Sequence, residues 1–236
     1  MKTGKQTNYL EEFNKFLQTV PLKDYRKRYS TIKIVEMDLP KEVQAINLLY
    51  KVYWEEKKFV PFEKFYERYL EEKKELLEKF RKKTTMCKDC FTRGIEARIY
   101  RTWAGLITQI HGGYVAESVF GKETVSMSRE LDSLGADIRV EYNKHILNYQ
   151  VKKTSFSGVM SRTPLPRKKS NDGENIDIKY EVPPCLSDPK TKKGEFRLPY
   201  LRFLEDKRTA AFDNGFVVFT PETFLPKKKE IDNSLK

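Results

Sequence analysis

Two runs of alternating apolar and polar residues, separated by Asn143 and Lys144, constrain the fold of this chain more than any other feature. Alternation with a period of two is the pattern of a half-buried β-strand. Two polar residues between such runs have the length of a tight hairpin turn, although Asn-Lys is a weaker turn signal than Asn-Gly. The sequence therefore predicts an antiparallel hairpin over residues 136–152.

The hairpin turn fixes which residues face each other. If Tyr142 pairs with His145, then Asp137 pairs with Gln150, and their Cβ atoms lie roughly 4.5–5.5 Å apart. Lys152 is the next residue but one after Gln150, so its side chain emerges on the same face. We therefore expect one face to carry Asp137, Gln150 and Lys152. The opposite face should pack on the core and contains Ala136, Ile138, Val140, Leu147, Tyr149 and Val151.

The rest of the chain is mostly helical in pattern. Apolar residues recur at helical spacing over residues 8–20, 43–53, 62–83 and 95–109. We expect Gly112 and Gly113 to break the last of these helices, so that Glu117 lies on a separate short helix ending at Gly121. Residues 172–195 resemble a polar loop, 215–220 a strand, and the Lys-rich end from residue 226 a solvated tail. The prediction is a mainly helical region over 1–95 and a second region over 96–236, together in one compact domain.

The charge of the chain limits its partners. The sequence has 46 Lys and Arg against 34 Asp and Glu, a formal net charge of +12. Such a surplus attracts polyanions, of which nucleic acid is the commonest in cells, although solvated lysines without such a role are the alternative. The sequence contains neither a run of ~18 apolar residues for a membrane helix nor the apolar segment of a secretory signal. We expect a cytoplasmic protein without membrane contact.

A basic arm follows the second strand of the predicted hairpin. Residues 152–171 include six Lys or Arg and no acid, and their Pro, Ser and Gly content is typical of a loop or weakly ordered arm. Side chains here could reach bases, but contact with phosphates is the commoner role of basic residues. The candidate DNA contacts are Lys153, Ser155, Ser157, Ser161, Arg162, Arg167, Lys168 and Lys169.

The cysteines and histidines give weaker signals. Cys87 and Cys90 form a C-x-x-C pair, and zinc would need two further ligands, which Cys185, His111 or His145 could supply only through long-range folding. Reduced cysteines and a structural zinc site are both open, and the reduced form is the simpler interpretation. We expect both histidines to be structural rather than general bases.

A carboxylate, an amide and an ammonium on one face suit phosphodiester hydrolysis. The attacking water must lose a proton while negative charge grows on the phosphate and the leaving oxygen, and Mg2+ with oxygen ligands serves both needs. Asp137 and the main-chain carbonyl of Val151 are candidate ligands, and Glu117 and Asp132 are further ones. Lys152 could stabilise the developing charge or hold the attacking water.

The sequence Asp137 followed by Gln150-Val151-Lys152 resembles the PD-(D/E)xK motif of nucleases. It departs from that pattern because Ala136 replaces the Pro and Gln150 replaces the second acid, which leaves the number of metal ions open. The resemblance implies an α/β fold with a restriction-endonuclease-like core, in which helices flank a mixed sheet and a helical N-terminal region precedes it. Residues 96–236 would then be the nuclease catalytic core.

Two longer segments, residues 13–54 and 101–121, resemble TaqI-type restriction endonucleases, and the likeness extends to about residue 160. It implies a Mg2+-dependent type II restriction enzyme that cuts double-stranded DNA within the palindrome TCGA and leaves a 5′ overhang. Asp132 and Asp137 would be essential acids, and Lys152 or the adjacent Lys153 the catalytic lysine. The likeness also implies a prokaryotic source and a companion DNA methyltransferase that protects the same site.

A palindromic site has two equivalent scissile bonds, so we expect a homodimer on DNA. The sequence leaves two alternatives open. One is another nuclease of the same fold, such as a junction resolvase or a repair endonuclease. The other is a non-catalytic nucleic-acid-binding protein whose C-x-x-C pair holds zinc.

Overall fold

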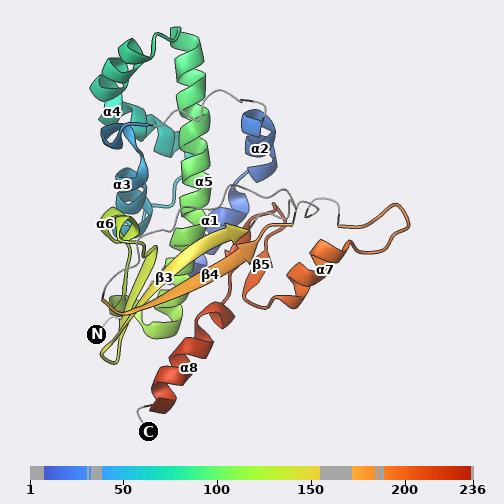
Figure 1. Ribbon diagram of the computed structural model, residues 1–236. Coiled ribbons are helices and arrows are strands. Elements are labelled where there is room, and N and C mark those ends of the chain that lie inside the picture. The colour runs from blue at the N-terminus through green and yellow to red at the C-terminus, as the bar shows by residue number, and fades with distance from the viewer. Residues whose placement is uncertain are drawn as a thin grey trace, which may run out of the picture. The chain divides into compact units, whose positions relative to one another are not determined.

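The structure is a computed structural model that describes residues 8–30, 32, 39–154, 172–183, 186 and 189–234 (Figure 1). The chain forms two compact units. We call residues 11–107 the helical unit, and residues 1–10 together with 108–236 the sheet unit. Among the described residues, no helix has both the length and the apolar character needed to cross a membrane.

The helical unit contains the helices that the sequence predicts. They are α1 (Tyr9–Thr19), α2 (Leu22–Ser30), the 3-10 helix η1 (Lys41–Val43), α3 (Ile46–Leu49), the π-helical η2 (Tyr50–Glu55), α4 (Phe62–Thr84) and the first part of α5 (Lys88–Phe120). The helical patterns over 62–83 and 95–109 fall within α4 and α5, and those over 8–20 and 43–53 coincide with α1 and with η1, α3 and η2 except at residues 8, 20, 44 and 45. The helical N-terminal region is therefore confirmed.

Aromatic side chains form the core of the helical unit. The rings of Tyr29 and Tyr100 stack with centroids 4.5 Å apart. Trp103 Nε1 donates a hydrogen bond of 2.8 Å to the hydroxyl of Tyr53, and both residues are fully buried. Buried Trp and Tyr need such polar partners, and these two satisfy each other. The helical spacing of aromatics in the sequence thus reflects packing.

Helix α5 does not break where the sequence predicts. It continues as one 33-residue helix through Gly112 and Gly113, so the predicted separate short helix is wrong and Glu117 lies near the end of α5. A Cβ at Gly112 would lie 3.1 Å from Ile138 Cδ1 and from Phe219 Cδ2. The glycine lets the helix approach the sheet closely, and this packing offsets a helix-propensity cost of about 1 kcal/mol.

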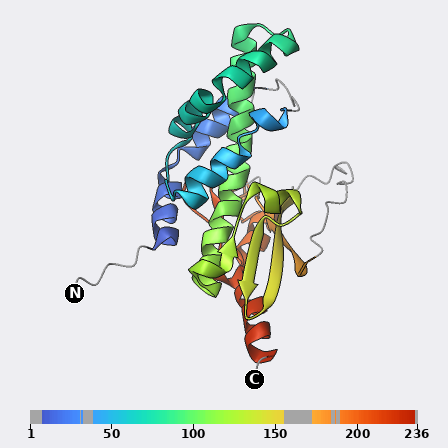
Figure 2. The same cartoon turned by 90° about the vertical axis from the view of Figure 1, so that its left-hand side faces the viewer.

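A mixed four-stranded sheet forms the centre of the sheet unit (Figure 2). Its order is β1 (Val125–Ser126), β2 (Ile138–Tyr142), β3 (His145–Thr154) and β4 (Glu174–Glu181). Strands β1 to β3 pair antiparallel, whereas β4 runs parallel to β3. The remaining elements are η3 (Lys122–Thr124), α6 (Arg129–Ser133), α7 (Leu198–Glu205), the small sheet of β5 (Thr209–Ala211) and β6 (Val217–Phe219), η4 (Pro221–Thr223) and α8 (Leu225–Ser234).

The predicted hairpin is confirmed in strand positions and in register. Tyr142 pairs with His145 and Ile138 with Tyr149. Asn143 and Lys144 both have positive φ, 48° and 66°, the pattern of a type I′ turn. The predicted core face is buried throughout, namely Ala136, Ile138, Val140, Leu147, Tyr149 and Val151.

Two predictions for the C-terminal third are wrong. Residues 174–181, expected within a polar loop, form β4, which buries Ile178 and Tyr180. The expected solvated tail instead contains α8, which buries Ile231 and anchors Asp232 by a 2.8 Å hydrogen bond from the hydroxyl of Tyr142. Both segments are polar in composition because most of their side chains face solvent. The few apolar residues that pack on the rest of the unit nevertheless stabilise regular structure there. The strand expected over 215–220 is confirmed as β6.

Candidate active site

Asp137 reaches the sheet through the end of α6. Gly135, with φ 92°, follows this helix, and its N–H donates to the carbonyl of Asp132 while the Ala136 N–H donates to that of Leu131. This pair of bonds is the Schellman motif, which ends helices at a glycine. The chain therefore leaves α6 in a fixed direction and places Asp137 directly before β2.

The Asp137 carboxylate is held against β3. Its Oδ2 accepts a hydrogen bond of 2.6 Å from the Val151 N–H, and its own N–H donates to the Tyr149 carbonyl at 2.9 Å. Only 1% of the residue is exposed. Burial of a carboxylate is costly unless it is hydrogen-bonded. The structure thus places Asp137 against Tyr149 and Val151, the residues on either side of Gln150, and the strand pairing begins one residue later, at Ile138 with Tyr149.

Gln150 and Lys152 complete the group on β3. Gln150 is buried, and its Nε2 donates to the Gly135 carbonyl at 3.3 Å, which ties it to the same turn that delivers Asp137. Lys152 is half-buried, and its Nζ lies 2.6 Å from Asp177 Oδ2 on β4. Asp177 was missed at the sequence level. The alternation of Ile176, Ile178 and Tyr180 around it was the available signal.

The oxygen donors of this group fit a hard divalent cation. Mg2+ usually takes one or two carboxylates and completes its octahedron with waters and substrate phosphate. Asp137 and the Val151 carbonyl are donors of this kind. The predicted ligands Glu117, near the end of α5, and Asp132, on α6, are both half-buried. They do not form a three-acid cluster with Asp137, since no cluster of three or more His, Cys, Asp or Glu residues occurs among the described residues.

The histidines lie where the sequence places them. His111 is 1% exposed within α5, and burial lowers its pKa from 6.5 to about 3, so the ring is neutral at physiological pH. His145 is exposed next to the hairpin turn, at the far end of β3 from Lys152.

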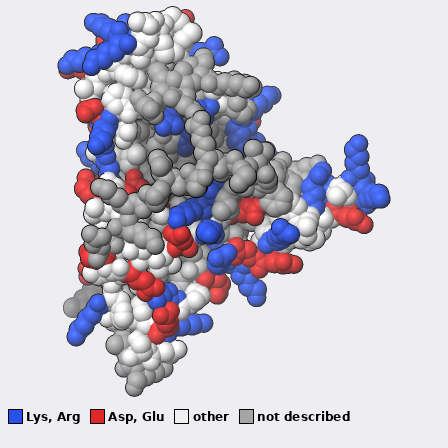
Figure 3. Space-filling view, viewed as in Figure 1, with Lys and Arg blue, Asp and Glu red and all other residues white. Residues whose placement is uncertain are grey.

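The predicted DNA contacts fall mostly outside the described residues. Lys153 is exposed on β3 opposite Tyr180. On the face shown in Figure 3, Lys and Arg side chains lie among Asp and Glu side chains. Residues 155–171 are not described, and they contain Ser155, Ser157, Ser161, Arg162, Arg167, Lys168 and Lys169.

The C-x-x-C pair lies at the beginning of α5. Both cysteines are exposed, and the Cys90 N–H donates to Cys87 Sγ at 3.3 Å. The hydrogen bond from the Cys90 thiol lowers the pKa of Cys87. Cys185 lies outside the described residues. The described part of the chain therefore offers this pair no third cysteine, histidine or acid with which to hold zinc.

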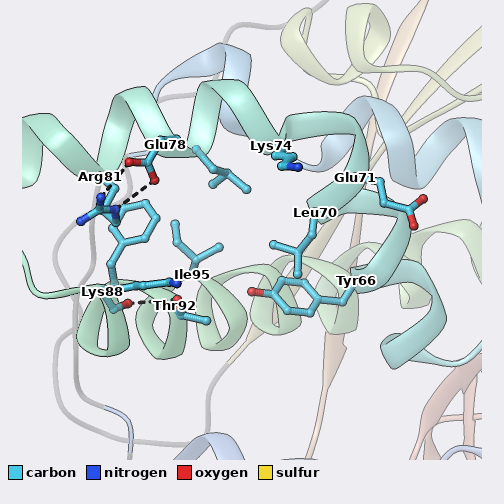
Figure 4. Close-up of a pocket in the computed structure, with 11 residues that line it drawn as sticks. Tyr66, Leu70, Glu71, Lys74, Glu78, Arg81, Lys88, Thr92 and Ile95 are labelled. Carbon is cyan, nitrogen blue, oxygen red and sulfur yellow. Dashed lines mark hydrogen bonds and ion pairs between the residues drawn. The ribbon is translucent and has the colours of Figure 1, made fainter.

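A hollow of about 370 Å³ lies between α4 and α5 in the helical unit (Figure 4). Its lining is mainly apolar, with Leu70, Leu77, Phe91 and Ile95 among the contributing residues, and the ion pair of Glu78 with Arg81 lies at one end. None of the residues of the predicted active site lines it.

Comparison with known proteins gives consistent matches over most of the chain. The sequence model of the TaqI restriction endonuclease family matches residues 10–233. The type II restriction enzyme TaqI of Thermus aquaticus is 29% identical over 219 residues, which cover 89% of this chain and 83% of the relative. The type II restriction enzyme TthHB8I of Thermus thermophilus is 29% identical over 249 residues, covering 96% and 88%. No solved structure matches.

Proposed function

The chain belongs to the TaqI restriction endonuclease family, and from this premise we propose that it is a type II restriction endonuclease that cuts double-stranded DNA within TCGA with the help of Mg2+. The observation that carries the proposal is the contact of the Asp137 carboxylate with the N–H of Val151, the residue between Gln150 and Lys152. A fixed carboxylate can hold the metal ion, and an ammonium can offset charge on the phosphate, in metal-assisted phosphodiester hydrolysis.

In the proposed mechanism Asp137 and the Val151 carbonyl would hold Mg2+, and Glu117 or Asp132 would add a further ligand or support one. Mg2+, when bound, supplies a Lewis acid for the phosphate and lowers the pKa of the attacking water. Gln150 contributes a neutral amide where related motifs carry an acid. Asp137, already fixed to β3, needs no rearrangement to bind, which is the preorganisation that electrostatic catalysis requires.

Lys152 directs its ammonium at the scissile phosphate and holds the attacking water. The register supports Lys152 over Lys153 in this role, because Lys152 shares a strand face with Gln150 whereas Lys153 pairs with Tyr180, whose side chain is buried. The charge of the ammonium offsets the negative charge that grows in the transition state.

We assign DNA contacts to the basic arm and expect the symmetry of the DNA site to require two copies of the chain. Lys153 and the serines and basic residues of 155–171, which follow β3 in the sequence, would contact phosphates and bases. The two-fold symmetry of a palindrome calls for two copies of the active site, hence a homodimer. We further propose a cytoplasmic prokaryotic setting with a methyltransferase that protects the same sequence.

The test is digestion of a sequenced plasmid with and without Mg2+, followed by mapping of the ends. We expect a fixed set of fragments with ends inside TCGA. Asp137→Asn retains the acceptor for the Val151 N–H, and Lys152→Ala truncates a partly exposed side chain at Cβ, so both variants should fold and bind DNA while cleaving at least about a hundredfold more slowly. Glu141→Gln removes an exposed acid of β2 and serves as the matched control. Cleavage of branched DNA alone, or full activity of either site variant, would refute the proposal.

A further inference from the structure

Strand β4 adds a carboxylate next to the proposed active site. In the parallel register of β3 and β4, Asp177 is paired with Gln150, and Lys152 is paired with Lys179. Asp177 therefore lies beside the motif position at which Gln150 replaces an acid. Gly173, with φ 87°, allows β4 to begin here, because a Cβ at this position would collide with the main-chain oxygen of Ile146 on β3.

The Lys152 ammonium forms an ion pair with Asp177, which is not the residue paired with Lys152 in the strand register. Its Nζ lies 2.6 Å from Asp177 Oδ2, a diagonal contact from one strand to the next. Lys179 is a like charge directly across from Lys152, and like charges in opposed positions repel. The carboxylate offsets this repulsion and draws the ammonium along the sheet toward Gln150, which is paired with Asp177.

We propose that Asp177 is a positioning residue for Lys152. This inference rests on the proposed function. A lysine side chain has four flexible bonds and a large rotamer freedom, so a free Lys152 would spend little time in the reactive position. Asp177 fixes its ammonium before DNA arrives, and small misplacement of such a group can cost roughly a hundredfold in rate.

The solvent exposure of the Lys152–Asp177 ion pair distinguishes a positioning role in catalysis from a role in folding stability. The side chains of Lys152 and Asp177 are 39% and 48% exposed, and ion pairs this open to water contribute little to folding. Asp177→Asn should therefore leave the melting temperature unchanged. The same substitution should lower kcat by about ten- to a hundredfold with KM for DNA changed by less than about threefold, because the lost interaction acts on the reacting centre.

The experiment compares Asp177→Asn and four further variants with the wild type in one cleavage assay. Asp177→Glu keeps the carboxylate and should recover much of kcat. Asp177→Asn combined with Lys152→Ala should be no slower than Lys152→Ala alone, since residues that act through one another are not additive. Asp172→Asn is the matched control, because Asp172 is 57% exposed and pairs with Arg139 at 2.7 Å on the same sheet. It should behave as the wild type.

Calorimetric titration with Mg2+ in the absence of DNA completes the test. Unchanged affinity in Asp177→Asn supports positioning, whereas an affinity at least tenfold lower overturns it in favour of a ligand role. Wild-type kcat in Asp177→Asn, or a further loss in the double variant, also overturns it. A wild-type protein that cleaves no DNA refutes the proposed function itself. An active wild type with an unaffected Asp177→Asn refutes only this inference.

Discussion

Replacement of buried His111 should change how stability depends on pH. Its ring is 1% exposed inside α5, and desolvation lowers its pKa from 6.5 to about 3. The folded protein therefore excludes the proton that the unfolded chain accepts near neutrality. His111→Gln removes this titration and keeps a polar side chain of similar length.

The sign and size follow from proton linkage. Because the pKa is depressed by folding, the stabilising contribution is complete above pH 6.5 and is lost as the pH falls toward 3. Each pH unit within that window lowers the free energy of unfolding by up to about 1.4 kcal/mol. Between pH 7 and pH 4 the loss attributable to His111 amounts to about 3 kcal/mol.

Urea denaturation of both proteins at pH 7, 6, 5 and 4 measures this loss. Carboxylates titrate in both proteins and cancel in the difference. From pH 7 to pH 4 the free energy of unfolding of the wild type should fall by about 3 kcal/mol more than that of His111→Gln. Any stability advantage of the wild type at pH 7 should therefore shrink by that amount, or the variant should become the more stable protein. Parallel pH profiles would refute the reasoning, because they would mean that the folded state accepts the proton as readily as the unfolded chain.

Three further substitutions test positions where a glycine is present or would be favoured. Gly112→Val should destabilise the protein by roughly 1–3 kcal/mol, since the Cβ alone already lies 3.1 Å from Ile138 and Phe219. Gly105→Ala on the same helix meets no atom within 4 Å and should stabilise by up to about 1 kcal/mol, and thermal unfolding that moved both variants in one direction would contradict this packing. Lys144→Gly should stabilise by roughly 0.4–1 kcal/mol in urea titrations because it relieves a φ of 66°, and a lower midpoint would speak against the type I′ turn.

The part of the fold that could be predicted from sequence is the part encoded locally. Strict alternation and a two-residue turn define the hairpin, and the same pattern defines the pairing of β2 with β3 from Tyr142 opposite His145 to Ile138 opposite Tyr149. The helices before it repeat apolar residues over long stretches, which makes their existence plain. Each of these signals lies within a window of about twenty residues.

The rest depends on partners that are distant in the chain. Strand β4 pairs with β3, which precedes residues 155–171 in the sequence, and most β4 residues are polar, so the short alternation of Ile176, Ile178 and Tyr180 is the only local signal that separates it from a loop. The contact of Asp177 with Lys152 arises only from that pairing. The effect of Gly112 on its helix could not be predicted from nearby residues either. It depends on strands that are distant in the sequence and that pack where a side chain at position 112 would lie.

Helix α5 has a consequence for cooperativity. The boundary between the two units falls between residues 107 and 108, inside this uninterrupted helix. In an α-helix each N–H bonds to the carbonyl four residues earlier, so every turn of α5 depends on the turn that precedes it. Unwinding at one point therefore removes hydrogen bonds from the turn that follows. We expect α5 to form and to melt cooperatively along its length.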